Sequence, residues 1–265
     1  MDLGLADARV VVTGGASNIG RGIVHAFATE GARIVINDID ERQAEKVRTE
    51  AENLGAAHVD VVIADLTLPG AAEAAVGAAT VAWGGIDVLV NNAGWSVPGF
   101  VATDTDRDKW QRTIEINLFS AISATQAAIP PMKEAGGGAI LFIASDAAFG
   151  QIRQGVYGAS KAAMVALART TAREHGRHGI RSNVICPGLV MPDGPEAIGE
   201  TSLWAVGQDE IFNQNQIDFM LKDTPLRRLT SAEDIGRAAL WFSSPTAARQ
   251  VTGQLISVSG GYTMP

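Results

Sequence analysis

Cysteine and basic side chains are both scarce in this sequence of 265 residues. The one cysteine, Cys186, excludes an internal disulfide and is typical of a protein in a reducing compartment. Lysine and arginine number 21 against 29 aspartate and glutamate, and the resulting net charge of −8 argues against a nucleic-acid-binding surface. Uninterrupted apolar runs stay below the ~18 residues of a membrane span, and the N-terminal segment does not resemble a signal peptide. The sequence therefore predicts a cytoplasmic protein whose partner is neither nucleic acid nor a membrane.

Side chains that ligate metals or act as thiol nucleophiles are also few. His175 and His178 lie near the end of a predicted helix without a third ligand in view, so no metal site is expected. Their expected role is a favourable interaction with the helix dipole. Cys186 has no histidine beside it in the sequence, and we interpret it as a small buried residue rather than a nucleophile.

Short β-branched segments alternate with helical segments along the whole chain. The segments that predict strands are residues 9–13, 33–37, 57–64, 86–90, 139–143, 180–185 and 254–258. Their spacing of about 25 to 30 residues is typical of βαβ units, whose strands form a parallel sheet. Neither an internal repeat nor a linker divides the chain. We therefore predict one domain over residues 1–265, an α/β fold with a Rossmann-type, doubly wound parallel sheet of seven strands.

Residues 189–228 interrupt this alternation, and we call them the lid segment. They place Trp204, Phe212, Phe219 and Met220 between polar residues directly after a predicted strand. This pattern favours a helical lid over the substrate, and the alternative is a plain surface insertion. The alternation also predicts a long helix over residues 108–129 that is stopped by Pro130 and Pro131.

The first predicted strand runs directly into a glycine-rich turn over residues 14–20, which is followed by a predicted helix over residues 21–30. Strand, glycine turn and helix in this order are the context of a dinucleotide fingerprint. The glycines let the backbone approach a pyrophosphate, which rests on the N-terminus of the helix. At this point the alternative is a tight connection without a ligand.

Asp38 ends the second predicted strand, roughly 20 residues beyond the glycine turn. A carboxylate in this place hydrogen-bonds the 2′-hydroxyl of the adenosine ribose and repels a 2′-phosphate. The next residue is Ile39, and the glycine turn contains no lysine or arginine. These features predict NAD rather than NADP as the cofactor. An alternative or additional role for Asp38 is to cap the helix that follows.

Tyr157 and Lys161 lie four residues apart at the start of a segment rich in Ala, Leu, Met and Arg, which predicts a helix. On a helix the two side chains share one face. A nearby ammonium lowers the pKa of a tyrosine, which then exchanges a proton with an alcohol or a ketone. Alone this pattern is weak and equally describes a surface helix. It becomes informative because the preceding chain predicts a nicotinamide site.

Several short motifs follow one another in the order found in one known family. They are Thr13-Gly14, Asp65-Leu66, Asn91 to Gly94, Asn117, Ser145, Tyr157 with Lys161, and Pro187-Gly188. Each motif is loose by itself. Taken together, from Thr13 to Gly261, they resemble the short-chain dehydrogenase/reductase family.

The resemblance implies roles for four catalytic residues. Tyr157 is the general base in oxidation and the acid in reduction, and Lys161 lowers the pKa of Tyr157 and hydrogen-bonds the nicotinamide ribose. Ser145 hydrogen-bonds the substrate oxygen, and Asn117 holds a water that connects Lys161 to solvent. The residues expected to contact NAD are Gly14, Ser17, Asn18, Ile19, Gly20, Asp38, Ile39, Asp65, Leu66, Asn92, Ala93, Gly94, Tyr157, Lys161, Pro187, Gly188 and Val190.

Asn18 stands where the family usually has glycine. Asparagine tolerates a positive φ better than most residues, so we expect the turn to form. Its side chain either narrows the approach to the pyrophosphate or hydrogen-bonds a phosphate or a ribose.

Apolar side chains follow three of the sheet-exit motifs and predict a wall for a ring or alkyl body. Each of them singly is equally compatible with a place in the core. Gln154 and Arg153 precede Tyr157 and are expected to meet a polar or anionic end of the substrate. The residues expected to contact substrate are Trp95, Ser145, Phe149, Gln154, Leu189 and Trp204. Segments such as VLVNNAGW, IASDAA and VICPG are similar to dehydrogenases of alicyclic hydroxyacyl-CoA thioesters, so a CoA thioester substrate is a hypothesis.

The sequence thus predicts an NAD-dependent oxidoreductase that interconverts a secondary alcohol, cyclic or hydroxyacyl, and its ketone. One alternative is a 3-oxoacyl thioester reductase, which would favour NADP and is disfavoured by Asp38. Another is a non-catalytic NAD-binding regulator, which would have no reason to retain the four catalytic residues together. By resemblance, the helices over residues 108–129 and 157–175 form a four-helix contact between subunits. We expect a homotetramer, although composition does not distinguish it from a dimer.

Overall fold

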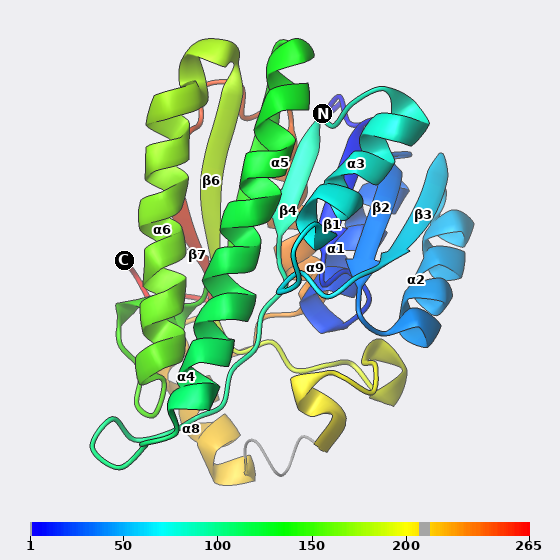
Figure 1. Cartoon of the computed structure of the whole chain (residues 1–265). Coiled ribbons are helices and arrows are strands. Elements are labelled where there is room, and N and C mark those ends of the chain that lie inside the picture. Colours follow the sequence, from blue (N-terminus) through cyan, green and yellow to red (C-terminus); the bar gives the residue numbers. More distant parts are fainter. Residues whose placement is uncertain (1, 207–212) are drawn as a thin grey trace.

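The computed structural model describes residues 2–206 and 213–265, which are built around one seven-stranded parallel sheet (Figure 1). The strands are β1 (Arg9–Thr13), β2 (Arg33–Asp38), β3 (His58–Ile63), β4 (Val88–Asn91), β5 (Gly138–Ile143), β6 (Ile180–Pro187) and β7 (Leu255–Val258). Their order is β3-β2-β1-β4-β5-β6-β7, so the chain reverses its direction of travel between β1 and β4. The predicted α/β class and the seven-stranded, doubly wound sheet are confirmed.

Helices cover both faces of the sheet. The α-helices of the described residues are α1 (Asn18–Thr29), α2 (Glu41–Leu54), α3 (Ala71–Trp83), α4 (Arg107–Ile114), α5 (Ser120–Glu134), α6 (Gly155–His175), α8 (Gln214–Asp223) and α9 (Ala232–Ser243). Buried side chains of α1, α2 and α9 form one apolar cluster with the sheet, and those of α3, α5 and α6 form another on the opposite face. Within the described ranges, no helix is both long and apolar enough to cross a membrane.

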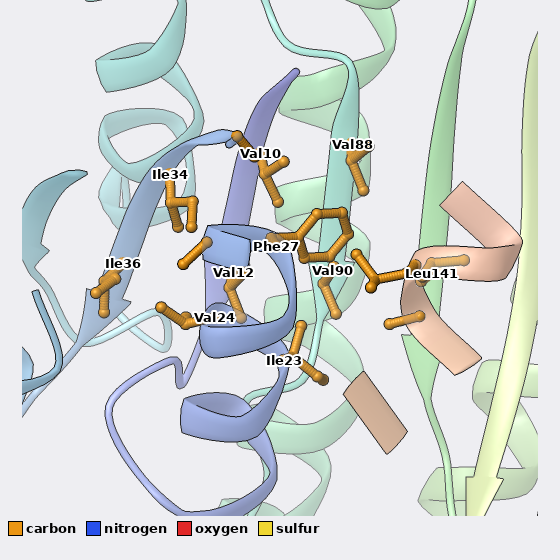
Figure 2. Close-up of a cluster of buried hydrophobic side chains, with 14 of the residues drawn as sticks. Val10, Val12, Ile23, Val24, Phe27, Ile34, Ile36, Val88, Val90 and Leu141 are labelled. Atoms are coloured by element: carbon orange, nitrogen blue, oxygen red, sulfur yellow. The ribbon is translucent and has the colours of Figure 1, made fainter. Parts of the chain in front are cut away.

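The strands at the centre of the sheet are apolar on both sides because both of their faces are covered. Along β1, Val10 and Val12 pack into the α1 cluster, whereas Val11 packs into the opposite one. Figure 2 shows the α1 side, where Phe27 lies among valines of β1 and β4. Burying such a side chain contributes about 1.5–3 kcal/mol, so these layers fix the strand ends that carry the polar motifs.

The predicted helix over residues 108–129 differs from the structure in two ways. A π-helical turn over Glu115–Phe119 separates α4 from α5, and α5 continues through Pro130 and Pro131 to Glu134. A proline inside a helix costs about 3 kcal/mol, so local sequence alone predicts a stop there. Burial of the Met132 side chain, one residue beyond the prolines, offsets part of this cost and keeps the last turn helical.

The lid segment leaves the sheet and returns to it at neighbouring points. Val190 and Thr230 form an isolated parallel bridge at its base. Between them lie the 3-10 turns Pro195–Ala197 and Leu203–Val206 and helix α8. Phe212, which the sequence placed in the lid, lies outside the described residues. The extent of the domain over residues 1–265 stays a prediction.

Candidate active site

A hollow of about 470 Å³ lies at the carboxyl edge of the sheet, where the glycine turn, the ends of β2 and β4, and α6 meet. The expected site residues that line it are Gly14, Ser17, Asn18, Ile19, Gly20, Asp38, Ile39, Asp65, Leu66, Asn92, Ala93, Gly94, Trp95, Tyr157, Lys161 and Trp204. Those outside its lining are Asn117, Ser145, Phe149, Gln154, Pro187, Gly188, Leu189 and Val190. Of these, Asn117, Ser145 and Val190 hydrogen-bond to lining residues and so form a second layer.

Some residues of the lining were not predicted from the sequence. Arg112, Ile116 and Ser120 follow one another at intervals of four residues and all face the hollow. That spacing is a helical signal which the sequence contains. Thr201 and Ser202 were missed for a different reason, because their position depends on where the lid segment lies and not on any local pattern.

The glycine turn is held by backbone contacts that leave no room for side chains. A Cβ on Gly20 would lie 1.9 Å from the carbonyl oxygen of Gly14, and a Cβ on Gly14 would lie 2.9 Å from Ala93 Cα. Asn92 locks this arrangement, because its Nδ2 donates to the carbonyl oxygens of Thr13 and Gly14 at 3.0 and 2.8 Å. The motif after β4 thus fixes the shape of the turn after β1.

Asn18 adopts the expected positive φ, at 42°, and its side-chain nitrogen bonds within the protein. Its Nδ2 donates to the carbonyl oxygen of Val190, 3.1 Å away at the base of the lid segment. Among the described residues, Asn18 Oδ1 and the Ser17 hydroxyl are buried and have no hydrogen-bond partner. Ser17 precedes α1 without capping it, so polar groups at this helix N-terminus stay available to a phosphate-bearing ligand.

Asp38 fastens the end of β2 to the glycine turn. Its Oδ2 accepts a hydrogen bond from Ala16 N at 3.0 Å, and its Oδ1 accepts from the backbone nitrogens of Ile39 and Asp40. Burial raises the pKa of this carboxyl, and the three hydrogen bonds oppose the rise. The cap of α2 is Asp40, whose Oδ1 accepts from Gln43 N, so the alternative capping role for Asp38 is wrong. Asp38 is therefore an acceptor built into the wall of the hollow.

Tyr157 and Lys161 lie one turn apart on α6, with Lys161 Nζ 5.7 Å from the centre of the tyrosine ring. Lys161 is almost fully buried, its Nζ donates to the carbonyl oxygen of Ile143 at 2.8 Å, and burial lowers its pKa to about 8. Burial raises the pKa of Tyr157, and a hydrogen bond with Ser145 opposes this rise. The expected lowering of the tyrosine pKa by Lys161 is not found: burial has the largest effect on this pKa, and Lys161 is not among the groups that shift it.

Asn117 lies within the π-helical turn, which turns its amide toward the segment after β4. Its Oδ1 accepts from Trp95 N at 2.7 Å, and its Nδ2 donates to Trp95 O and to the Ser160 hydroxyl. The Ser160 hydroxyl in turn donates to the carbonyl oxygen of Tyr157 at 2.6 Å. A π-helical turn often marks a functional site, and this one joins the wall of the hollow to the helix that carries the tyrosine.

The residues after β5 and β6 support the site from behind. Ser145 Oγ accepts from Ala147 N at 3.1 Å and caps the short turn that follows. Asp146 Oδ1 accepts from the Ser257 hydroxyl of β7, so this carboxyl ties the turn after β5 to the neighbouring sheet edge. Cys186 is fully buried, and burial raises its thiol pKa to about 12, as expected of a packing residue.

The expected substrate residues fall into two groups. Trp95 and Trp204 line the hollow, and the guanidinium carbon of Arg112 lies 5.2 Å from the centre of the Trp95 ring. Phe149 is 44% exposed outside the hollow, and Leu189 is only partly buried. Gln154 Oε1 accepts from the Ser96 hydroxyl at 2.9 Å and so links two loops at the rim.

Three comparisons with known proteins agree with this geometry. The family model described as enoyl-(acyl carrier protein) reductase matches residues 14–263. The chain is 37% identical to 7alpha-hydroxysteroid dehydrogenase of Escherichia coli (strain K12) over 252 residues, which cover 95% of this chain and 92% of that protein. It is 34% identical to (2S)-[(R)-hydroxy(phenyl)methyl]succinyl-CoA dehydrogenase subunit BbsD of Thauera aromatica, with 99% of each chain covered. A solved 7alpha-hydroxysteroid dehydrogenase, in complex with NADH and 7-oxo glycochenodeoxycholic acid, superposes with a TM-score of 0.86 at 36% identity and covers 98% of this chain and 96% of its own.

Proposed function

This chain belongs to the short-chain dehydrogenase/reductase family, and we propose that the hollow binds a cyclic or hydroxyacyl secondary alcohol beside NAD. The protein is an NAD-dependent oxidoreductase that interconverts a hydroxyl and a keto group. One observation carries the assignment of roles to residues. Tyr157 and Lys161 line the same hollow as Asp38 and the glycine turn, so a proton-transfer pair and a dinucleotide cradle share one space.

The residues around the glycine turn suit NAD. Asp38 is positioned to accept from the ribose 2′-hydroxyl, and the unpartnered Ser17 hydroxyl is positioned to donate to the pyrophosphate at the N-terminus of α1. The lack of room at Gly20 lets the backbone itself form the cradle. NAD, when bound, takes up a hydride from the carbinol carbon in oxidation and returns it in reduction.

The chain supplies the proton transfer. In oxidation the phenolate oxygen of Tyr157 accepts the proton of the alcohol. In reduction the phenol hydroxyl of Tyr157 donates its proton to the ketone oxygen. Burial opposes formation of the phenolate, so a compensating charge is required. Lys161 supplies it, because its ammonium form predominates below about pH 8. Ser145 shares a hydrogen bond with Tyr157 and is placed to hold the substrate oxygen next to the phenol.

The walls of the hollow favour a substrate with an apolar body and an anionic end. Trp95 and Trp204 offer flat apolar surfaces, and Arg112 adds a cation to the same lining. The similar proteins named above act on a steroid and on an acyl-CoA, both of which combine an apolar body with polar or charged groups. We therefore propose a cyclic hydroxy acid or a hydroxyacyl-CoA thioester as the substrate class.

Absorbance at the NADH band tests this proposal, with NAD and NADP each offered with a panel of cyclic secondary alcohols and hydroxyacyl-CoA thioesters. We expect reduction of NAD by a cyclic or hydroxyacyl substrate and little reduction of NADP. Tyr157→Phe should lower kcat by about 10²- to 10⁴-fold, the usual contribution of general acid–base catalysis, while NADH still binds. Tyr262→Phe is the matched control, since it removes the other tyrosine hydroxyl of the chain. Turnover only with NADP and a 3-oxoacyl thioester would instead favour the reductase alternative.

We also propose a homotetramer in the cytoplasm. Helices α5 and α6 lie next to each other on one face of the sheet (Figure 1), and Phe119 at the start of α5 is 48% exposed. These are the helices for which the resemblance to the family predicts a contact between subunits. Light scattering on the purified protein should give four times the mass of one chain, and a mass of one or two chains would refute the tetramer.

A further inference from the structure

One part of the lid segment, residues 195–202, is hydrogen-bonded to the first turns of α2, and we call it the strap. The carbonyl oxygen of Glu196 accepts from Gln43 Nε2 at 3.1 Å and from Lys46 Nζ at 2.7 Å. Glu200 N donates to Asp40 Oδ2 at 2.8 Å. Ala197, between these two anchor points, is buried. The strap is therefore docked by directional hydrogen bonds and by packing, and it does not hang freely over the sheet edge.

Asp40 joins the strap to the cofactor side of the hollow. Its Oδ1 caps α2 through Gln43 N, while its Oδ2 holds Glu200 N. Its own backbone nitrogen donates to Asp38 Oδ1 at 3.2 Å. A continuous chain of hydrogen bonds thus runs from the strap through Asp40 to the carboxylate proposed to hold the adenosine ribose.

The far end of the strap turns back into the hollow. Thr201 and Ser202 line it together with Asp38 and Ile39. Figure 1 shows the strap crossing the carboxyl edge of the sheet to reach α2 before the chain continues toward α8. The lid segment was expected to cover the substrate, yet the strap lies beside the end of β2, which is the adenosine side of the hollow.

We propose that the strap is the outer wall of the adenosine subsite, that Asp40 positions it, and that NAD leaves only after the strap has detached from α2. This inference rests on the proposed role of Asp38 in binding NAD. Asp40 itself touches neither cofactor nor substrate in this proposal and acts through the strap. The chemistry at Tyr157, on the other side of the hollow, does not depend on it.

A substitution at Gly199 would disturb the contact between the strap and Asp40 at the start of α2. A Cβ added there would lie 2.3 Å from Asp40 Oδ2 and 3.1 Å from Gln43 Cβ. Gly199 does not have a left-handed φ, so alanine at this position perturbs the contact with α2 and not the local backbone. Asp40→Ser keeps a side chain that can cap α2, but this side chain is one atom shorter than aspartate. It lacks Oδ2, the oxygen that the methyl group of Gly199→Ala would meet.

The test is the rate of NADH release, measured by stopped-flow fluorescence when NADH-loaded protein is mixed with excess NAD, without any alcohol present. We expect Gly199→Ala to speed release about tenfold, because each lost hydrogen bond is worth a factor of a few. Asp40→Ser should also speed release several-fold. In the Asp40→Ser background, Gly199→Ala should add less than about a factor of two, because the clash is gone.

A matched control and a second readout separate this role from a general structural one. Arg42→Ala removes only the ion pair between Arg42 and Glu200, whose side chains are 82% and 81% exposed, and should change release less than about twofold. The KM for NAD should rise in Gly199→Ala while the KM for the alcohol stays constant. An unchanged release rate in Gly199→Ala, or the same acceleration in both backgrounds, would overturn the proposal. Failure of the parent protein to bind NADH at all would instead refute the NAD-binding roles on which the strap depends.

Discussion

Lys161→Met removes a buried ammonium group that we expect to lower the free energy of unfolding of the wild-type protein. Only 3% of this residue is exposed, and burial lowers its pKa from 10.5 to about 8. A pKa that is lower in the folded than in the unfolded chain means that folding disfavours the charged lysine. At 1.36 kcal/mol per pKa unit, this difference corresponds to about 3 kcal/mol of stability that the wild-type protein forgoes at neutral pH.

The sign of this effect sets its dependence on pH. Between about pH 8 and pH 10.5 the unfolded chain binds more protons at Lys161 than the folded chain does, so wild-type stability rises with pH relative to Lys161→Met. Above this window both states hold a neutral lysine, and the term vanishes. The loss of the hydrogen bond to Ile143 and any change in packing shift the whole curve by a constant and leave this slope unchanged.

Urea unfolding followed by circular dichroism measures the difference at a series of pH values and a fixed protein concentration. We expect the stability of Lys161→Met minus that of wild type to fall by about 3 kcal/mol from about pH 7 to about pH 11. Lys133→Met, which alters an exposed lysine on α5, is the matched control for the substitution itself. A flat or rising difference for Lys161→Met would refute the idea of a costly buried ammonium. The same substitution should abolish turnover, which would show that the charge is retained for chemistry at the expense of stability.

Three further predictions concern the cofactor cradle. Asp38→Asn removes the charge that would repel a 2′-phosphate, so the ratio of kcat/KM for NADP to that for NAD should rise about tenfold, and an unchanged ratio would count against Asp38 as the discriminating residue. Gly20→Ala places a Cβ 1.9 Å from the Gly14 carbonyl oxygen, so NADH binding measured by fluorescence should be lost, and retained binding would contradict the observed turn. Asn18→Gly removes the hydrogen bond to Val190 but fits the positive φ, so the Kd for NADH should rise about three- to fivefold with little change in Tm, and a large fall in Tm would point to a wider structural role.

The sheet was predictable because its signal is local and repeated. The buried strands contain short apolar runs, such as Val10 to Val12, and each is followed by turn or helix residues. The carboxyl ends of parallel strands meet at one edge, so the order of motifs along the chain is enough to predict that the glycine turn, Asp38 and Asn92 converge. The hollow that they line confirms this convergence.

What the sequence did not predict depends on contacts between distant segments. The partner of Asn18 is 172 positions away at Val190, and the anchor of Glu200 is Asp40, 160 positions away at the start of α2. Helix α5 continues through two prolines, and the Met132 side chain that follows them is buried in the core. Helix propensity does not include such burial. The pKa of Tyr157 rises because burial outweighs its hydrogen bond with Ser145, and neither effect can be read from the spacing of Tyr157 and Lys161. In each case the outcome depends on residues that are distant in the sequence and close in the fold.

The bridge between Val190 and Thr230 gives the lid segment a closed base. Thr230 Oγ1 and Gly188 N both bond to the carbonyl oxygen of Val258, so both ends of the segment are fastened to β7 independently of what lies between them. The free energy of closing a loop grows only with the logarithm of its length, so residues 191–229 can be lengthened, shortened or exchanged at small cost to the sheet. Changes in the length or sequence of this segment can therefore alter the lining of the hollow without unfolding the sheet beneath it.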